Sequence, residues 1–278
     1  MTFPRTRIGD VSVSRLIIGT NWFLGFSHTS AAKDRQIKAT MTPDRIADVI
    51  EVFLNEGIDT VIGLNQAAAL HDGIREAEQR TGRECIVIST PGINIGDDAD
   101  SRAQAEQTLD KEAELGTAIC MPHQFVTDRL VDVQGRRIRN MDVYCQMIRE
   151  RGMLPGLSTH MPETIVYADE TDLDVETYLS IYNAAGFLMH LEIDWVHRLI
   201  WRAKHPVITI KPLATGRLLP LVGLAFNWST IRDVDMVAVG TSTPEEAREV
   251  IEISHAVLEH RVADVQLQET RSKQTIKP

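Results

Sequence analysis

The sequence lacks several features that would assign it to a special class of protein. None of its apolar runs is long enough to span a bilayer, and residues 1–7 lack the apolar core of a signal peptide. Lys and Arg do not cluster, and the formal net charge of −10 argues against nucleic acid or an anionic membrane surface as a partner. The simplest prediction is a cytoplasmic protein that binds a small-molecule substrate, while the oligomeric state stays open.

The sequence also has few cysteines and no repeat or linker. Cys85, Cys120 and Cys145 are an odd number, lie among apolar residues and show no CxxC spacing, so we expect buried reduced thiols. The chain has 278 residues, of which 43% are hydrophobic, and can therefore bury a large core. This length fits one large α/β domain as well as two small ones.

Strand-like and helix-like segments alternate along the chain with little between them. A small hairpin is expected at 8–14, and buried strands at 15–20, 59–63, 85–90, 118–123, 154–159, 178–183, 207–211 and 236–241. Helices are expected after Thr42 and at about 71–81, 101–115, 140–151, 162–170, 194–204, 217–229 and 244–258. Eight strands that each lead into a helix predict an α/β fold of the (β/α)8 TIM-barrel type. We expect this single domain over 1–258 and a polar C-terminal tail over 259–278.

Four segments carry a resemblance to a known family. They are 13–20 (VSRLIIGT), 152–163 (GMLPGLSTHMPE), 210–217 (IKPLATGR) and 239–249 (VGTSTPEEARE). In this order and spacing they resemble the aldo-keto reductase family. The resemblance implies an eight-stranded α/β barrel with an N-terminal hairpin, which agrees with the strand count. It also implies carbonyl reduction with NADPH by an Asp, a Tyr, a Lys and a His, in which the Tyr donates the proton.

Three of these four catalytic positions are not matched. Ile62 stands where the family's Asp is expected, segment 64–71 contains no Tyr, and Pro91 stands where the Lys is expected. Only the His is matched, by His123. We therefore expect that ordinary carbonyl reduction has been lost.

The cofactor positions implied by the resemblance are matched in part. Ser158 corresponds to the residue that binds the nicotinamide amide, whereas Thr159 replaces the usual Asn. Gly240, Thr241 and Ser242 keep the form of a phosphate loop before a helix, which suits an anion. NADP(H) is kept as an alternative cofactor, although a protein that does not bind NADP(H) is favoured.

Polar side chains at the strand ends are the candidates for replacing the lost chemistry, because barrel active sites lie there. Asn21, Trp22, Asn65, Ser158 and Asn183 are candidate substrate-binding residues. A second set, consisting of imidazoles and a carboxylate, suits a divalent metal such as Zn or Mn. Its members are His123, His160, His190 and Glu192. The alternatives are that His160 caps the helix after it and that His190 and Glu192 belong to a solvated loop.

Lys211 has two interpretations. A buried lysine at a barrel strand end forms a Schiff base with a carbonyl substrate when its pKa is lowered. The same lysine can bind an anionic group as a plain cation. The resemblance places it at or beside the position where many family members stack an aromatic ring on the nicotinamide.

The long segment after the first strand, residues 21–34, is expected to be a loop that acts as a lid or substrate clamp. Its polar side chains suit hydroxyl, phosphate or carboxylate groups, and His28 and Lys33 are its candidate substrate contacts. The alternative is a surface excursion that only covers the barrel.

The leading functional prediction is an enzyme of aldo-keto reductase-like fold that no longer catalyses a redox reaction. It would act on a small polar, sugar-like or carbonyl-bearing substrate by acid/base or metal-assisted isomerase or lyase chemistry, with His123, Lys211 and His160 as catalytic residues. The alternatives are a divergent NADP(H)-dependent oxidoreductase and a non-catalytic ligand-binding barrel.

Overall fold

The computed structural model describes residues 2–266 and residue 273 and contains a parallel barrel. The barrel strands are β3 (Leu16–Gly19), β4 (Thr60–Gly63), β5 (Ile86–Ser89), β6 (Ile119–Cys120), β9 (Leu154–Pro155), β10 (Leu157–Ser158), β11 (Tyr178–Ile181), β12 (Val207–Ile210) and β13 (Met236–Gly240). In the sheet, β3 lies between β13 and β4, and the sheet ends at β9 and β10. Each neighbouring pair is parallel. The eight predicted strands are confirmed, because β9 and β10 together form the fifth.

Gly156 joins the two ends of the sheet. A Cβ at this position would lie 2.9 Å from Cγ2 of Thr177 and 3.0 Å from Cγ of Met121, so only glycine fits without displacing neighbours. Because β9 pairs with β6 and β10 pairs with β11, this one short run closes the barrel.

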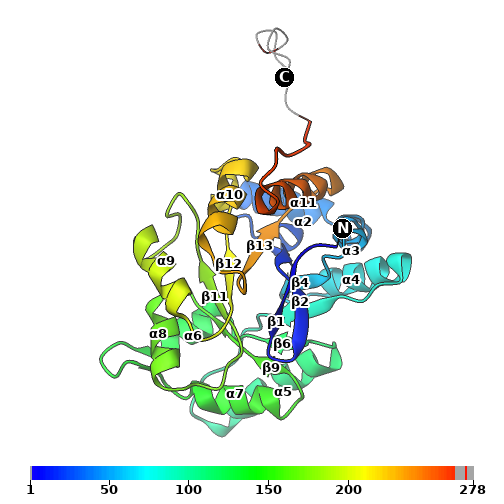
Figure 1. Ribbon diagram of the computed structural model, residues 1–278. Helices are drawn as coiled ribbons and strands as arrows, with labels where there is room; N and C mark the ends of the chain where they lie inside the picture. The colour runs from blue at the N-terminus through cyan, green and yellow to red at the C-terminus, as the bar shows by residue number, and fades with distance from the viewer. Residues whose placement is uncertain (1, 267–272, 274–278) are drawn as a thin grey trace.

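Helices surround the sheet (Figure 1). They are α1 (Asn21–Leu24), α2 (Ala31–Thr40), α3 (Pro43–Asn55), α4 (Ala68–Thr81), α5 (Ala99–Glu114), α6 (Gln124–Leu130), α7 (Met141–Arg149), α8 (Glu163–Glu170), α9 (Ile193–Arg202), α10 (Pro220–Thr230) and α11 (Pro244–Leu258). Their starts follow local capping rules where the sequence provides them. Thr42 and Thr243, for example, cap α3 and α11 through their side chains, and both of these helices have proline in the first turn.

Residues 21–24 and 31–34 of the segment predicted as a loop are helical, so the loop prediction was wrong for these residues, while 25–30 are not helical. Helix α2 has no apolar stripe from which it could be recognised, because Ile37 is its only buried residue. Helix α6 was also not predicted, since its 7 residues are too few for a periodicity. It is followed by a hairpin of β7 (Val131–Asp132) and β8 (Arg137–Ile138).

The N-terminal hairpin, β1 (Arg5–Ile8) and β2 (Val11–Ser14), starts three residues earlier than expected. Ile8 and Val13 belong to the same apolar cluster as Ile17, Ile88 and Met236, which point into the barrel from its strands. The hairpin therefore closes the end of the barrel at which the strands begin.

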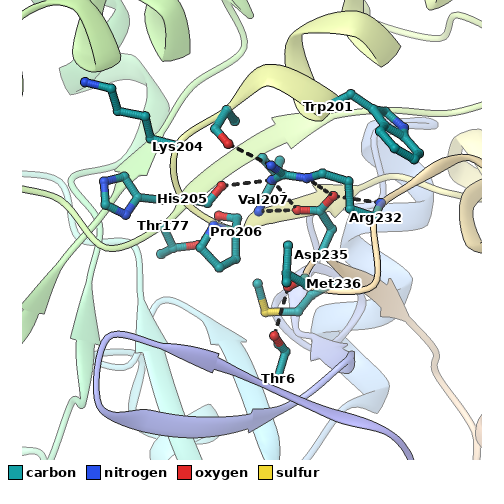
Figure 2. Close-up of polar contacts among 12 residues, drawn as sticks. Thr6, Thr177, Trp201, Lys204, His205, Pro206, Val207, Arg232, Asp235 and Met236 are labelled. Atoms are coloured by element: carbon teal, nitrogen blue, oxygen red, sulfur yellow. Dashed lines mark hydrogen bonds and ion pairs between the residues drawn. The ribbon is translucent and has the colours of Figure 1, made fainter.

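A buried ion pair holds the strand starts together at this end (Figure 2). Arg232 donates to both carboxylate oxygens of Asp235, at 2.9 Å and 2.7 Å, and to the carbonyls of Ala203 and His205, at 2.7 Å and 2.9 Å. Asp235, whose side chain is fully buried, also accepts from the backbone N–H of Val207 at 2.8 Å. The pair thus links the chain before β12 to the chain before β13.

Helix α11 ends at Leu258, as predicted, and 259–266 contain neither helix nor strand. Most of the rest of the predicted tail lies outside the described residues. The three cysteines are free, with Cys120 and Cys145 buried and Cys85 half-buried. Among the described residues, no helix is long and apolar enough to cross a membrane.

Candidate active site

The candidate site lies at the end of the barrel where the parallel strands finish. His123 follows β6, His160 follows β10 and Lys211 follows β12, so the parallel arrangement brings all three to one face. These are the three residues that the sequence nominated as catalytic. Their roles remain a proposal.

Lys211 is half-buried, and its backbone has a φ of 60°, which is unusual for a residue with a side chain. Its Nζ lies 3.3 Å from Nε2 of His28. Burial lowers the pKa of Lys211 to about 8, and no carboxylate within residues 2–266 forms an ion pair with it. The amine is therefore a partly dehydrated cation without a counter-charge.

Two imidazoles share this environment. Burial, followed by the charge of Lys211, lowers the pKa of His123. Burial, followed by the charges of Lys211 and His123, lowers the pKa of His160 to about 3. His160 does not cap α8, whose cap position is Pro162. Both imidazoles are consequently neutral near pH 7.

Asp128 on α6 is a site residue that the sequence did not reveal. Its carboxylate accepts hydrogen bonds from Oγ1 of Thr159 at 2.5 Å and from the backbone N–H of His160 at 3.2 Å. Burial raises the pKa of Asp128. The only available signal was its position five residues after His123, which has meaning only once α6 is known.

The segment from α1 to α2 reaches over the strand ends. His28 lies between the two helices, and its Nε2 is within 3.4 Å of Nδ2 of Asn21 as well as near Lys211. Trp22 and Lys33 form a cation–π contact, with Nζ 5.6 Å from the ring centroid. His28 thus contacts the buried amine directly, whereas Lys33 binds within its own segment.

Two predicted substrate-binding residues make structural contacts instead. Asn65 is buried, and its Nδ2 donates to Oγ1 of Thr117 at 3.0 Å. Asn183 is buried and uses its side chain within its own loop, because Nδ2 donates to the carbonyl of Phe187 and Oδ1 accepts from the same residue's N–H. Both ends of the Asn183 amide are engaged, so substrate binding by Asn183 would require these contacts to break, whereas Oδ1 of Asn65 has no hydrogen-bond partner among the described residues.

The predicted cofactor residues differ in how far their hydrogen-bonding groups are engaged. The backbone N–H and hydroxyl of Ser242 both donate to Oε2 of Glu246, at 2.7 Å and 2.9 Å. Trp22 packs against Gly240, where a Cβ would come within 2.9 Å of its Cδ1. Thr159 is occupied by Asp128, and Thr241 is buried with its hydroxyl unpaired. Ser158 is also buried, and no hydrogen bond from its hydroxyl is seen among the described residues.

The predicted metal set is not assembled. His190 and Glu192 are exposed residues before α9. Within residues 2–266 and 273, no three His, Cys, Asp or Glu side chains are placed so that they could hold a metal ion. The solvated-loop alternative for His190 and Glu192 agrees better with their exposure.

Two of the positions that the resemblance pairs with the family's catalytic residues hold apolar side chains. Ile62 is the next-to-last residue of β4 and packs in the apolar interior of the barrel. Pro91 is buried two residues beyond β5, and its carbonyl accepts from the N–H of His123 at 2.9 Å.

Comparison with solved structures shows one recurring fold. A protein of Pseudomonas aeruginosa assigned to the aldo-keto reductases aligns with a TM-score of 0.66 and 14% identity, over 91% of this chain and 96% of its own. An aldo-keto reductase of Klebsiella pneumoniae in complex with NADPH gives 0.59 and 14%, over 95% and 92%. Aldose reductase of Giardia lamblia gives 0.56 and 11%, over 95% and 90%.

No family model and no curated protein matches the sequence. At sequence identities this low, structural similarity shows that the backbone fold is shared and does not show that the chemistry is shared. The chain therefore has the α/β-barrel fold of the aldo-keto reductases.

Proposed function

We propose that the protein is an enzyme that uses Lys211 to act on a small polar carbonyl compound by isomerase or lyase chemistry. The observation that carries the proposal is the amine of Lys211, which forms no ion pair with a carboxylate in the part of the chain that the structure describes and lies 3.3 Å from Nε2 of His28 at the strand ends. Strand ends of barrels are where catalytic groups are found.

The lowered pKa gives Lys211 a reactive fraction at neutral pH. With the pKa at about 8, about one amine in ten is unprotonated at pH 7, against fewer than about one in a thousand for an ordinary lysine. The unprotonated nitrogen attacks the carbonyl carbon, a C–N bond forms, and the carbonyl oxygen leaves as water. The resulting iminium accepts the electron pair of an adjacent C–H or C–C bond as that bond breaks.

His123 is the better-suited proton carrier of the two imidazoles. The pKa of His160 is so low that the ring is a weak base and serves as a neutral hydrogen-bonding group. Asp128 positions the backbone before His160 through its bonds to Thr159 and to the N–H of His160. In this scheme His123 removes the proton next to the iminium, or returns it after C–C cleavage.

Reductive trapping tests the proposal. Incubation with pyruvate or dihydroxyacetone phosphate and sodium borohydride is expected to reduce the imine to a stable secondary amine, and mass spectrometry of peptides should locate it on Lys211. The yield should rise with pH through about 8, because the unprotonated fraction rises there. Lys204, an exposed lysine paired with Asp172, is the internal control and should stay unmodified. Modification of both lysines alike, or of neither with a broad set of carbonyl compounds, would contradict the proposal and favour a non-catalytic binding barrel.

The alternative of an NADP(H)-dependent oxidoreductase receives less support. The hydrogen-bond donors of Ser242 bind Glu246, and Trp22 packs against Gly240. Two of the positions matched to the family's catalytic residues hold apolar side chains. These contacts argue against binding of the dinucleotide, whereas the unpaired hydroxyl of Thr241 is free to accept or donate a hydrogen bond. We expect no saturable change in tryptophan or NADPH fluorescence at micromolar NADPH, whereas saturable binding in that range would revive the redox alternative.

A further inference from the structure

We infer that the substrate carries an anionic group, a carboxylate or a phosphate, which binds within the cluster formed by Lys211 and the histidines at the strand ends. This inference rests on the proposed function, because it concerns the same site. It goes further in assigning the charge of the substrate and the residues that bind it.

The groups of the cluster come from five separate parts of the fold. They are Lys211 after β12, His28 between α1 and α2, His123 after β6, His160 after β10 and His190 before α9. The direct contact in the cluster joins Lys211 and His28, whose Nζ and Nε2 atoms lie 3.3 Å apart. His123 and His160 follow strands that end on the same face of the barrel, and the charges of the other groups add to burial in lowering the pKa of His160.

Two of the three carboxylates beside the cluster, Asp34 and Asp128, are already engaged in hydrogen bonds. Asp34 accepts from the N–H and hydroxyl of Ser27, at 2.9 Å and 2.6 Å. Asp128 accepts from Thr159 and from the backbone of His160. Glu163 has a buried Oε2 without a hydrogen-bond partner among the described residues, and its charge adds to burial in raising the pKa of Asp128. None of the three makes an ion pair with Lys211 in the described part of the chain, so the charge of the amine is left uncompensated.

An anion matches this arrangement better than a neutral ligand. A buried charge is costly unless it is paired, and a neutral carbonyl compound would bury the ammonium without pairing it. The iminium formed in the proposed reaction carries the same positive charge, so an anion compensates Lys211 before and after the covalent step. Lysine and histidine both donate to carboxylate and phosphate oxygens, which is why either group would fit.

Anion binding should change the protonation of the cluster. In the free protein the pKa of His28 and of His123 is lowered by burial first and by Lys211 second, so these imidazoles are mostly neutral at pH 7. A bound negative charge among these imidazoles counteracts the effect of the Lys211 charge and raises their pKa. Binding is then accompanied by proton uptake, and affinity should fall as the pH rises through neutrality.

Matched pairs of carbonyl compounds test the charge of the substrate. We would compare dihydroxyacetone phosphate with dihydroxyacetone, and pyruvate with acetone, for the concentration that gives half-maximal borohydride trapping on Lys211. The anionic member is expected to act at a concentration at least about tenfold lower. Preference within the first pair identifies a phosphate site, and preference within the second a carboxylate site.

Calorimetry supplies a readout that does not depend on trapping. Titration with inorganic phosphate and with acetate, in two non-phosphate buffers of different ionisation enthalpy at pH 7, should show proton uptake for the anion that binds. The variant H28N should weaken this binding several-fold and reduce the uptake. The control H71N, on α4 and outside the cluster, should leave both unchanged.

The outcomes separate the two proposals. Equal trapping of charged and neutral partners with no anion binding would overturn the anionic substrate and leave the Schiff-base function standing. Anion binding with proton uptake but no trapping would overturn the function and leave the anion site standing. Anion binding unchanged in H28N would overturn the assignment of the site to this cluster.

Discussion

Replacement of Lys211 by methionine is expected to abolish imine trapping and turnover while making the folded protein more stable at pH 7. Methionine has no amine, so the C–N bond cannot form. The gain in stability follows from the buried charge: the folded-state pKa is about 8, below the ordinary value of 10.5. Below pH 8 the amine is protonated in both states, and burying it costs the folded state about 3 kcal/mol.

The pH dependence of the stability shows whether the charge of Lys211 stabilises or destabilises the folded protein. Between about pH 8 and 10.5 the unfolded chain binds a proton that the folded chain has lost, so the stability of the unaltered protein rises with pH. The variant K211M lacks this rise and should be more stable below pH 8 by up to about 3 kcal/mol, as measured by urea unfolding at pH 7 and pH 10.

The variant K211R is the matched control for this prediction. Arginine keeps the positive charge but is not an amine nucleophile, so trapping should be lost while anion binding is largely retained. Turnover that survives in K211R would show that Lys211 acts only as a cation. A variant K211M that unfolds more easily than the unaltered protein at pH 7 would contradict the buried, unpaired charge.

Replacement of Arg232 by methionine is expected to reduce the free energy of unfolding by about 3–5 kcal/mol. The guanidinium makes four hydrogen bonds, two to Asp235 and two to backbone carbonyls (Figure 2). Its loss leaves the fully buried Asp235 carboxylate with backbone N–H partners only. The contact lies at the opposite end of the barrel from Lys211, so imine trapping by the folded fraction should be unchanged.

An exposed arginine on the same barrel is the comparison. Arg102 is paired with Glu106 at 3.5 Å, and its side chain keeps 67% of its surface exposed. The variant R102M should therefore change the free energy of unfolding by less than about 1 kcal/mol. Equal effects of R232M and R102M in urea unfolding would show that the buried pair contributes no more than a surface contact.

The outer helices show where sequence-based prediction reached its limit. Helix α3 was predicted, because it buries six residues at helical spacing and has a threonine cap. Helix α2 buries only Ile37, and α6 is a single short run after a strand. Without α6 there was no reason to bring Asp128 to the strand ends, and without α2 the path of His28 was unknown.

The sequence by itself determined the barrel and the face on which its chemistry lies. Eight apolar runs with helices between them form local patterns, and parallel strands share one direction, so His123, His160 and Lys211 had to meet at the ends of their strands. Only the tertiary structure decided which polar groups would pair. The side chain of Asn183 forms hydrogen bonds within its own loop, while Lys211 contacts His28, which lies 183 residues away in the chain. Burial and pairing depend on segments that are distant in sequence, and residue periodicity carries no information about them.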